Sequence, residues 1–430
     1  MLERLIRSAE QAEVVRVRRE ATSVVFEASR LKRSQVQETS GLAVRVVKDG
    51  RLGFAASSDT RATDRLMRNV LESAEHGDVV SFSLPTPQEA LDVVTFDESI
   101  AALSIGRLVE IGQEMLDLVL AVEPEANVEI ELTRGMEHLA LQNHSGTEVD
   151  FRRSPLSINL EVRRVRGDDV LITYDQTGTT VWDGQYMLSA QRLCRKLELA
   201  RNQVRLRSGR MPVLFAPKGS LVLGLPLMLG LNGKDVLKRA SPMAGKLGQK
   251  LFSDKLTVVD DPTIDGKFDS APFDDEGVSH RRNVLIDQGV VRAFLYDLKT
   301  ASQAGVESTG NGSRTLFTPP SPQPTNLLIE PGGASLGDML ASINSGLWVE
   351  DALGLGQGNV ISGAFSNSLS LAYKIENGQI IGRVKDVSIA GNIYDLLQQV
   401  DAVSREAEWV HHSVRVPYIM LGSMNVVSQE

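Results

Sequence analysis

A single cysteine, Cys194, occurs among the 430 residues, so no disulfide can form within the chain. Such sparing use of cysteine is typical of a reducing compartment. Cys194 lies on the apolar side of an expected helix, and no histidine is near it in sequence. We therefore predict a packed core thiol and not a reactive one.

Aromatic residues are few, and an excess of positive charge is absent. Aromatics make up 5% of the sequence, the formal net charge is −9 and the pI is near 5.4. An acidic chain disfavours a general surface for nucleic acid or anionic membranes. Few aromatics also disfavour a stacking platform for single strands. We expect no direct nucleic-acid partner, although the composition leaves a local basic patch open.

Long hydrophobic runs are missing as well. The most apolar run, residues 221–231, is too short to span a bilayer and contains Pro226. The first ten residues, MLERLIRSAE, are charged and lack the apolar centre of a signal peptide. We expect a cytoplasmic protein that does not enter a membrane.

The pattern of the chain changes near its middle. Residues 1–208 alternate like strands and contain three longer helical patterns. Residues 209–430 are richer in glycine, proline and aspartate and are mostly strand-like. We predict an α+β (mixed α/β) protein with an N-terminal mixed α/β domain, residues 1–208, and a β-rich C-terminal domain, residues 209–430.

Local signals predict individual elements. Apolar residues at helical spacing indicate helices over residues 104–122 and 182–204. The pairs Asp49-Gly50 and Gln288-Gly289 predict hairpin turns, because these residues tolerate positive φ. His411 and His412 are expected in a strand, where neighbours point to opposite faces and cannot share one metal.

Two motif-like strings have simpler explanations. Ser335 lies in a G-x-S-x-G string, but Asp338 three residues later and the apolar residues that follow favour a helix N-cap over a nucleophile. The glycines at 354, 356 and 358 do not form G-x-G-x-x-G, so no nucleotide site is expected there.

An acidic loop, residues 260–277, carries seven carboxylates. An EF-hand starting at Asp261 would need a glutamate at its twelfth position, where Pro272 stands. A weaker metal or cationic-substrate site stays open at Asp274, Asp275 and Glu276. The alternative is a solvated, hydrogen-bonded loop.

The C-terminal half contains an ordered set of strings: LFSDKLTVVDDPTIDG, SAPFDDEGVSHRRNVLIDQGVVRAFLYDLKTASQAG, STGNGSR, FSNSLSLAYKIENGQI and IAGN. Together with FAASSDTRATDRLMRNVLESAEHG in the N-terminal half, they resemble the TldD/PmbA family, formerly described as modulators of DNA gyrase. The match spans most of the chain. The resemblance implies a mixed α/β N-terminal domain before a β-rich C-terminal domain.

The family has two branches. TldD-type members carry H-E-x-x-x-H on a helix early in the C-terminal half, where the histidines bind zinc and the glutamate can act as general base. The corresponding segment here, KGSLVLGLPLMLGLNG, has no histidine and no acid. No cysteine follows Cys194, so a thiolate ligand near the C-terminus is missing as well. The sequence therefore resembles the PmbA (TldE) branch, which implies no catalytic residue, metal or cofactor in this chain.

By this resemblance, a TldE-type chain pairs with a zinc-containing TldD-type subunit in a heterodimeric peptidase that matures or degrades small peptides. A homodimer stays open for the chain alone, because a surface built for a homologous subunit can pair with itself. Two alternatives stay open: an active hydrolase with an unrecognised site, for which the acidic loop is a candidate, and a regulatory interaction protein that modulates gyrase.

We hypothesise that the segments STGNGSR and AYKIENG form or brace a cleft for an extended peptide. Their glycines permit close backbone approach, and a peptide added as a strand binds through its main chain. Asn311 and Arg314 are candidates to hold a carbonyl or carboxylate. The alternative is that both segments are tight turns. The candidate residues are Ser308, Thr309, Gly310, Asn311, Arg314, Glu376, Asn377 and Gly378.

Overall fold

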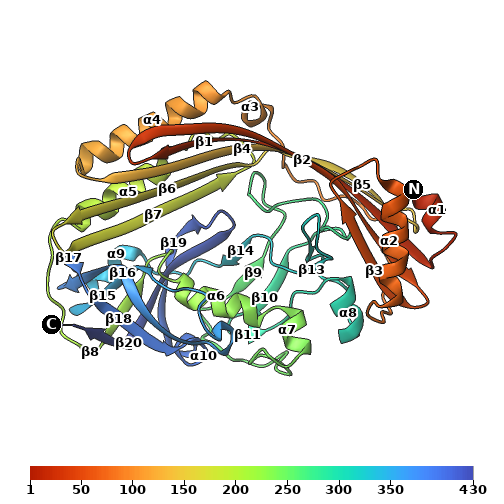
Figure 1. Ribbon diagram of the computed structural model, residues 1–430. Coiled ribbons are helices and arrows are strands. Elements are labelled where there is room, and N and C mark those ends of the chain that lie inside the picture. The colour runs from red at the N-terminus through yellow and green to blue at the C-terminus, as the bar shows by residue number, and fades with distance from the viewer. Residues whose placement is uncertain (430) are drawn as a thin grey trace.

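Two large β-sheets form the framework of the computed structural model, which describes residues 1–429 (Figure 1). The N-terminal sheet arches over the C-terminal half, and its outer face carries the long helix α4 (Ile105–Val122). This combination of sheets and packed helices confirms the predicted α+β class.

The N-terminal sheet is antiparallel, with strand order β3-β2-β1-β4-β6-β7 and β5 paired to β4. Side chains alternate between its faces, so Val24 and Phe26 of β1 lie under α4 and meet Leu108, Ile111 and Met115. The strands are β1 Gln11–Glu27, β2 Arg30–Lys48, β3 Arg51–Ser57, β4 Asn127–Asn143, β5 Glu148–Arg153, β6 Leu156–Arg166 and β7 Asp169–Thr179.

The helices of the N-terminal half cover this sheet. Helix α4 begins after Ser104, whose hydroxyl accepts the Arg107 N–H at 3.1 Å, so the helix predicted over residues 104–122 is confirmed. Helix α5 (Leu188–Leu199) packs beside α4 and buries Cys194, which confirms the core thiol. The remaining helices of this half are α1 Leu2–Leu5, α2 Thr63–Glu75 and α3 Glu98–Ala101.

The helix predicted over residues 182–204 is wrong at both ends, because α5 is shorter. Gly184 has a φ of 70°, a left-handed conformation that stops a helix from running through it. Beyond α5, the Val204 N–H donates to the Arg383 carbonyl at 2.9 Å, so this segment pairs with the C-terminal half instead. A tertiary pairing has overridden the local helical pattern.

Strands of the C-terminal half form a second sheet that closes on itself. β8 pairs with β15 in parallel and with β20 in antiparallel, so β20-β18-β16-β15-β8 make a ring. Inward residues such as Phe215, Val349 and Ile419 fill its core. The strands of this sheet are β8 Gly209–Phe215, β9 Val258–Asp260, β10 Asn283–Asp287, β11 Val290–Val291, β14 Leu327–Ile329, β15 Ser345–Ala352, β16 Ala364–Glu376, β17 Gln379–Val384, β18 Val387–Asn392, β19 Val400–Val410 and β20 Val414–Ser428. β12 Gly312–Ser313 and β13 Ser321–Pro322 form a separate two-stranded sheet.

The helices of the C-terminal half are short. They are α6 Leu221–Gly230, α7 Gly233–Leu237, α8 Leu298–Ala304, α9 Leu336–Ala341 and α10 Ile393–Leu396, with 3₁₀ turns at Val360–Ser362 and Leu397–Gln399. Ser335 caps α9 by accepting the Asp338 N–H at 3.0 Å, so the predicted N-cap is confirmed.

The predicted hairpin turns are confirmed, but the strand predicted at the paired histidines is wrong. Asp49-Gly50 joins β2 to β3, and Gln288-Gly289 joins β10 to β11, with positive φ at all four residues. Residues 411–412 form the turn between β19 and β20, with φ values of 46° and 67°. The His411 ring meets the Tyr174 ring edge-on, and the His412 ring stacks on the Phe268 ring. The two rings therefore have different neighbours.

The junction of the two halves lies between α5 and β8. β8 begins the second sheet at Gly209, one residue after the predicted domain limit at residue 208; the division into domains itself stays a prediction. Across residues 1–429, no helix has both the length and the apolarity to cross a membrane.

Candidate functional site

A groove lies between helix α6 and strand β16 in the C-terminal half. Its volume is about 570 Å³. One wall is the apolar side of α6, including Leu221 and Leu225, and the other is the glycine-rich segment 353–359. Gly354 and Gly356 have φ values of 73° and 85°, which hold this segment in a shape that other residues rarely adopt.

The floor of the groove is a strand edge. Residues 364–368 of β16 pair with β18 on one side, whereas pairing with β15 on the other side begins only at Leu369. Within the described residues, no strand covers the main chain of residues 364–367 on that second side. A free edge of this kind can take an extended peptide as an added strand.

The residues of α6 do not fit a zinc ion. The helix reads LVLGLPLMLG, so its side chains offer no imidazole, thiolate or carboxylate. Val222, Leu223, Pro226 and Leu227 are buried, and Pro226 leaves the carbonyl four residues before it without its usual helical donor. Nowhere in residues 1–429 do three or more His, Cys, Asp or Glu side chains come together as a metal site. We derive no metal-dependent step for this chain.

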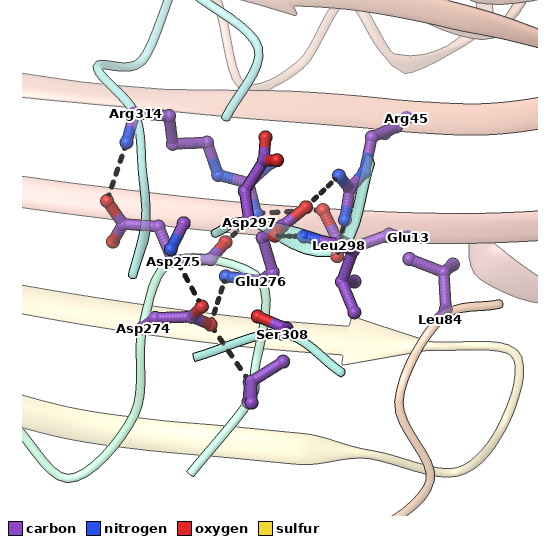
Figure 2. Close-up of polar contacts among 12 residues, drawn as sticks. Glu13, Arg45, Leu84, Asp274, Asp275, Glu276, Asp297, Leu298, Ser308 and Arg314 are labelled. Carbon is purple, nitrogen blue, oxygen red and sulfur yellow. Dashed lines mark hydrogen bonds and ion pairs between the residues drawn. The ribbon is translucent and has the colours of Figure 1, made fainter. Parts of the chain in front are cut away.

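The acidic loop lies against the N-terminal sheet, and Figure 2 shows its carboxylates turned toward donors. Asp274 accepts main-chain N–H groups from Glu276, Val278 and Gly312, each at 2.9 Å. Glu276 accepts the Leu298 N–H at 2.7 Å and pairs with Arg45. The expected loop is hydrogen-bonded, but at Asp274 and Glu276 it is buried and not solvated.

A buried charge network joins this loop to strands β1 and β2 (Figure 2). Arg45 lies opposite Glu13 in the β1–β2 register and pairs with it at 2.9 Å. Arg314 pairs with the other Glu13 oxygen at 2.8 Å, and Glu276 pairs with Arg45. All four side chains are at most 4% exposed. We call Glu13, Arg45, Glu276 and Arg314 the interdomain charge network.

Burial and the two arginines act in opposite directions on the carboxylates of this network. Burial favours a raised pKa for Glu13, but the charges and hydrogen bonds of Arg314 and Arg45 lower that pKa below its usual value. Burial raises the pKa of Asp274, and the neighbouring charge of Glu276 adds to the shift. Burial also raises the pKa of Glu276, although Arg45 opposes the shift. The carboxylates of Glu13, Asp274 and Glu276 already accept hydrogen bonds from the chain itself, which suits a structural link better than a substrate site.

Of the predicted cleft residues 308–314, Arg314 belongs to the interdomain charge network, and the others bind neighbouring segments of the C-terminal half. Thr309 accepts the Tyr296 N–H at 2.7 Å, and Ser308 donates to the Tyr296 carbonyl at 3.1 Å. Gly310 has a φ of 72°, and the Asn311 amide donates to Asp260 at 2.6 Å. These groups bind the chain itself, and their contact with a peptide stays a prediction.

The other predicted segment, Glu376, Asn377 and Gly378, lies elsewhere. Asn377 and Gly378 form the β16–β17 turn with φ values of 50° and 77°, and their N–H groups donate to the carbonyls of Asn344 and Ile343. Glu376 pairs with Lys374 at 3.1 Å. The two predicted segments share no hydrogen-bond partner, and a cleft formed by both stays a prediction.

Comparison with known proteins decides the family. Residues 208–428 match the PmbA/TldA metallopeptidase C-terminal domain, and residues 12–76 match PmbA/TldA metallopeptidase domain 1. The chain belongs to the PmbA/TldD family. The resemblance seen in the sequence is thereby confirmed.

Solved and curated relatives agree with this assignment. The crystal structure of TldE from Thermococcus kodakarensis superposes with a TM-score of 0.90 at 25% identity, covering 99% of each chain. A Thermotoga maritima protein, solved as a proposed modulator of a DNA gyrase, gives a TM-score of 0.90 at 22% identity over 99% of each chain, which shows the shared fold. A metalloprotease TldD homolog of Haemophilus influenzae is 33% identical over 228 residues, 53% of this chain and 47% of the relative.

Proposed function

We propose that this chain is the TldE-type, non-catalytic subunit of a two-subunit zinc metallopeptidase that matures or degrades small peptides in the cytoplasm. The apolar sequence of α6 carries the proposal, because a metallopeptidase needs a metal ligand set and a general base. The zinc then belongs to a TldD-type partner subunit. Whole-length similarity to a TldE structure supports this role.

The groove beside α6 suits a role in holding a substrate without cleaving it. Its free β16 edge offers main-chain hydrogen bonds that tolerate any side chain, and the apolar face of α6 offers contact area. An extended peptide is the substrate class that matches both features. We place substrate binding here rather than at residues 308–314, because those groups are already paired within the chain.

The experiment measures metal content and peptidase activity of the purified chain, alone and mixed with the TldD-type protein of the same organism. We expect no stoichiometric zinc and no cleavage from the chain alone, and cleavage from the mixture. A TldD-type protein with its motif glutamate replaced by glutamine is the control and should leave the mixture inactive.

Two results would overturn the proposal. Zinc and cleavage by the chain alone, lost on Asp274→Asn, would establish the hydrolase alternative. Tight binding of gyrase by the chain, together with no effect on a TldD-type protein, would establish the regulatory alternative.

A further inference from the structure

A basic groove lies at the junction of the two halves. The segment RNQVRLRSGR, residues 201–210, holds four arginines and no acid, in a chain whose net charge is −9. Three of these, Arg205, Arg207 and Arg210, are exposed and line a groove of about 1170 Å³. Lys374 and Lys385 line it from the C-terminal half, where the acids are Glu376 and Asp386. The described lining residues hold five cations and two anions, which makes the groove that they form locally positive. We call it the junction groove.

Among the described residues, 1–429, the arginines of the junction groove form no ion pair. Lys374 pairs with Glu376 at 3.1 Å, and Lys385 lies 3.8 Å from Asp169. Arg210 donates to the Ser423 hydroxyl, which carries no charge. Counting all carboxylates of residues 1–429, neither Arg205 nor Arg207 has an ion-pair partner within 4.0 Å. Like charges held close together at a surface repel one another, and this arrangement suits an anion from outside the chain.

The floor of the junction groove suits protein better than nucleic acid. Val204, Leu206, Met211 and Pro212 supply apolar contact for an extended main chain. No Phe, Tyr or Trp lines the groove, so bases would have nothing to stack on. The overall charge of −9 also repels a long polyanion, whereas a short acidic segment meets mainly the local positive field.

We propose that the junction groove docks an acidic, extended segment of a partner protein. Arginine forks match carboxylates in a bidentate geometry, so Arg205 and Arg207 are the principal contacts. This surface is separate from the groove beside α6, because the two share no lining residue. A negative result for the junction groove would therefore leave the peptidase role unaffected.

The test uses fluorescence anisotropy with a labelled ten-residue peptide of aspartate and glutamate, at low salt. The variant is Arg205→Gln/Arg207→Gln in the full chain. The matched control is Arg65→Gln/Arg68→Gln, which removes two exposed arginines from α2. We expect binding by the groove variant to weaken about fivefold to tenfold, as two exposed charge contacts would, and binding by the control to stay within about twofold.

A single-stranded DNA of ten nucleotides serves as the competing ligand. Equal or tighter binding of this DNA would overturn the proposal in favour of a nucleic-acid surface. Absence of peptide binding at low salt, or equal weakening in both double variants, would also overturn it. Thermal unfolding of each variant verifies that the substitutions leave the fold intact.

Discussion

The groove beside α6 and the interdomain charge network differ in the properties by which functional sites are usually recognised. The network is dense in charge and contains Arg45 and Glu276, but every carboxylate in it is buried and paired. The groove has almost no charge, yet it leaves a strand edge at residues 364–367 without a partner strand. A main-chain edge that lines a groove, and not the number of ionisable groups, distinguishes a surface for a ligand from a structural link here.

The largest expected effect comes from breaking the network. Replacing Arg45 by methionine leaves Glu13 and Glu276 buried with one cation fewer, and we expect a loss of about 3–5 kcal/mol in the free energy of unfolding. Chemical denaturation followed by circular dichroism measures it. Arg19→Met is the control, because Arg19 is half exposed and its pairing with Glu137 at 3.5 Å is worth about 0–1 kcal/mol. Equal losses in the two variants would contradict the structural role of the network.

The next effect concerns pH and His280, a buried residue beside the acidic loop. Burial lowers the pKa of His280 to about 4, from a usual value of 6.5. As pH falls, His280 of the unfolded chain therefore binds a proton before His280 of the folded chain does. The free energy of unfolding of the wild type should fall by about 2–3 kcal/mol between pH 6.5 and 4, relative to that of His280→Leu. Denaturation at several pH values measures this difference. Denaturation of His280→Leu at pH 7, where the wild-type histidine is largely neutral in both states, gives the reference for the difference.

The third prediction concerns the groove beside α6. Leu225→Arg places a charge on its apolar wall, and we expect about tenfold lower peptidase activity in the mixture with a TldD-type subunit, equivalent to about 1.4 kcal/mol. The unfolding midpoint should stay close to that of the wild type. Leu31→Arg is the matched control, because Leu31 is half exposed on β2. Unchanged activity with Leu225→Arg would remove this groove from substrate binding.

The smallest effect separates a helix cap from a nucleophile. Ser335→Ala should cost about 1 kcal/mol of stability, because the Asp338 N–H at the start of α9 loses its acceptor, whereas Ser335→Gly should cost only a few tenths. Thermal unfolding compares the two variants. Peptidase activity of the mixture should be the same for both, and its loss would revive a catalytic role for this serine.

Sequence reasoning reached the fold class and the local elements but missed the network. Glu13 lies on the same face of β1 as Val15 and Val17, and an acid on an apolar face is a signal that could have indicated a buried partner. Nothing in the sequence names that partner, since Arg314 is 301 residues away. The burial of the acidic loop is equally non-local, because Gly312 and Leu298 of the C-terminal half and Arg45 of the N-terminal sheet supply donors to its carboxylates.

The sequence by itself determined the features that depend on neighbouring residues. The turn at Asp49-Gly50, the cap at Ser335 and the absence of metal ligands in α6 are local, because φ preferences, capping and ligand chemistry act within a few residues. Tertiary structure alone decided the closure of the second sheet, the free edge of β16 and the pairing of Glu13 with Arg314. These depend on which distant segments pack together, and packing is set by the whole chain and not by any one stretch of it.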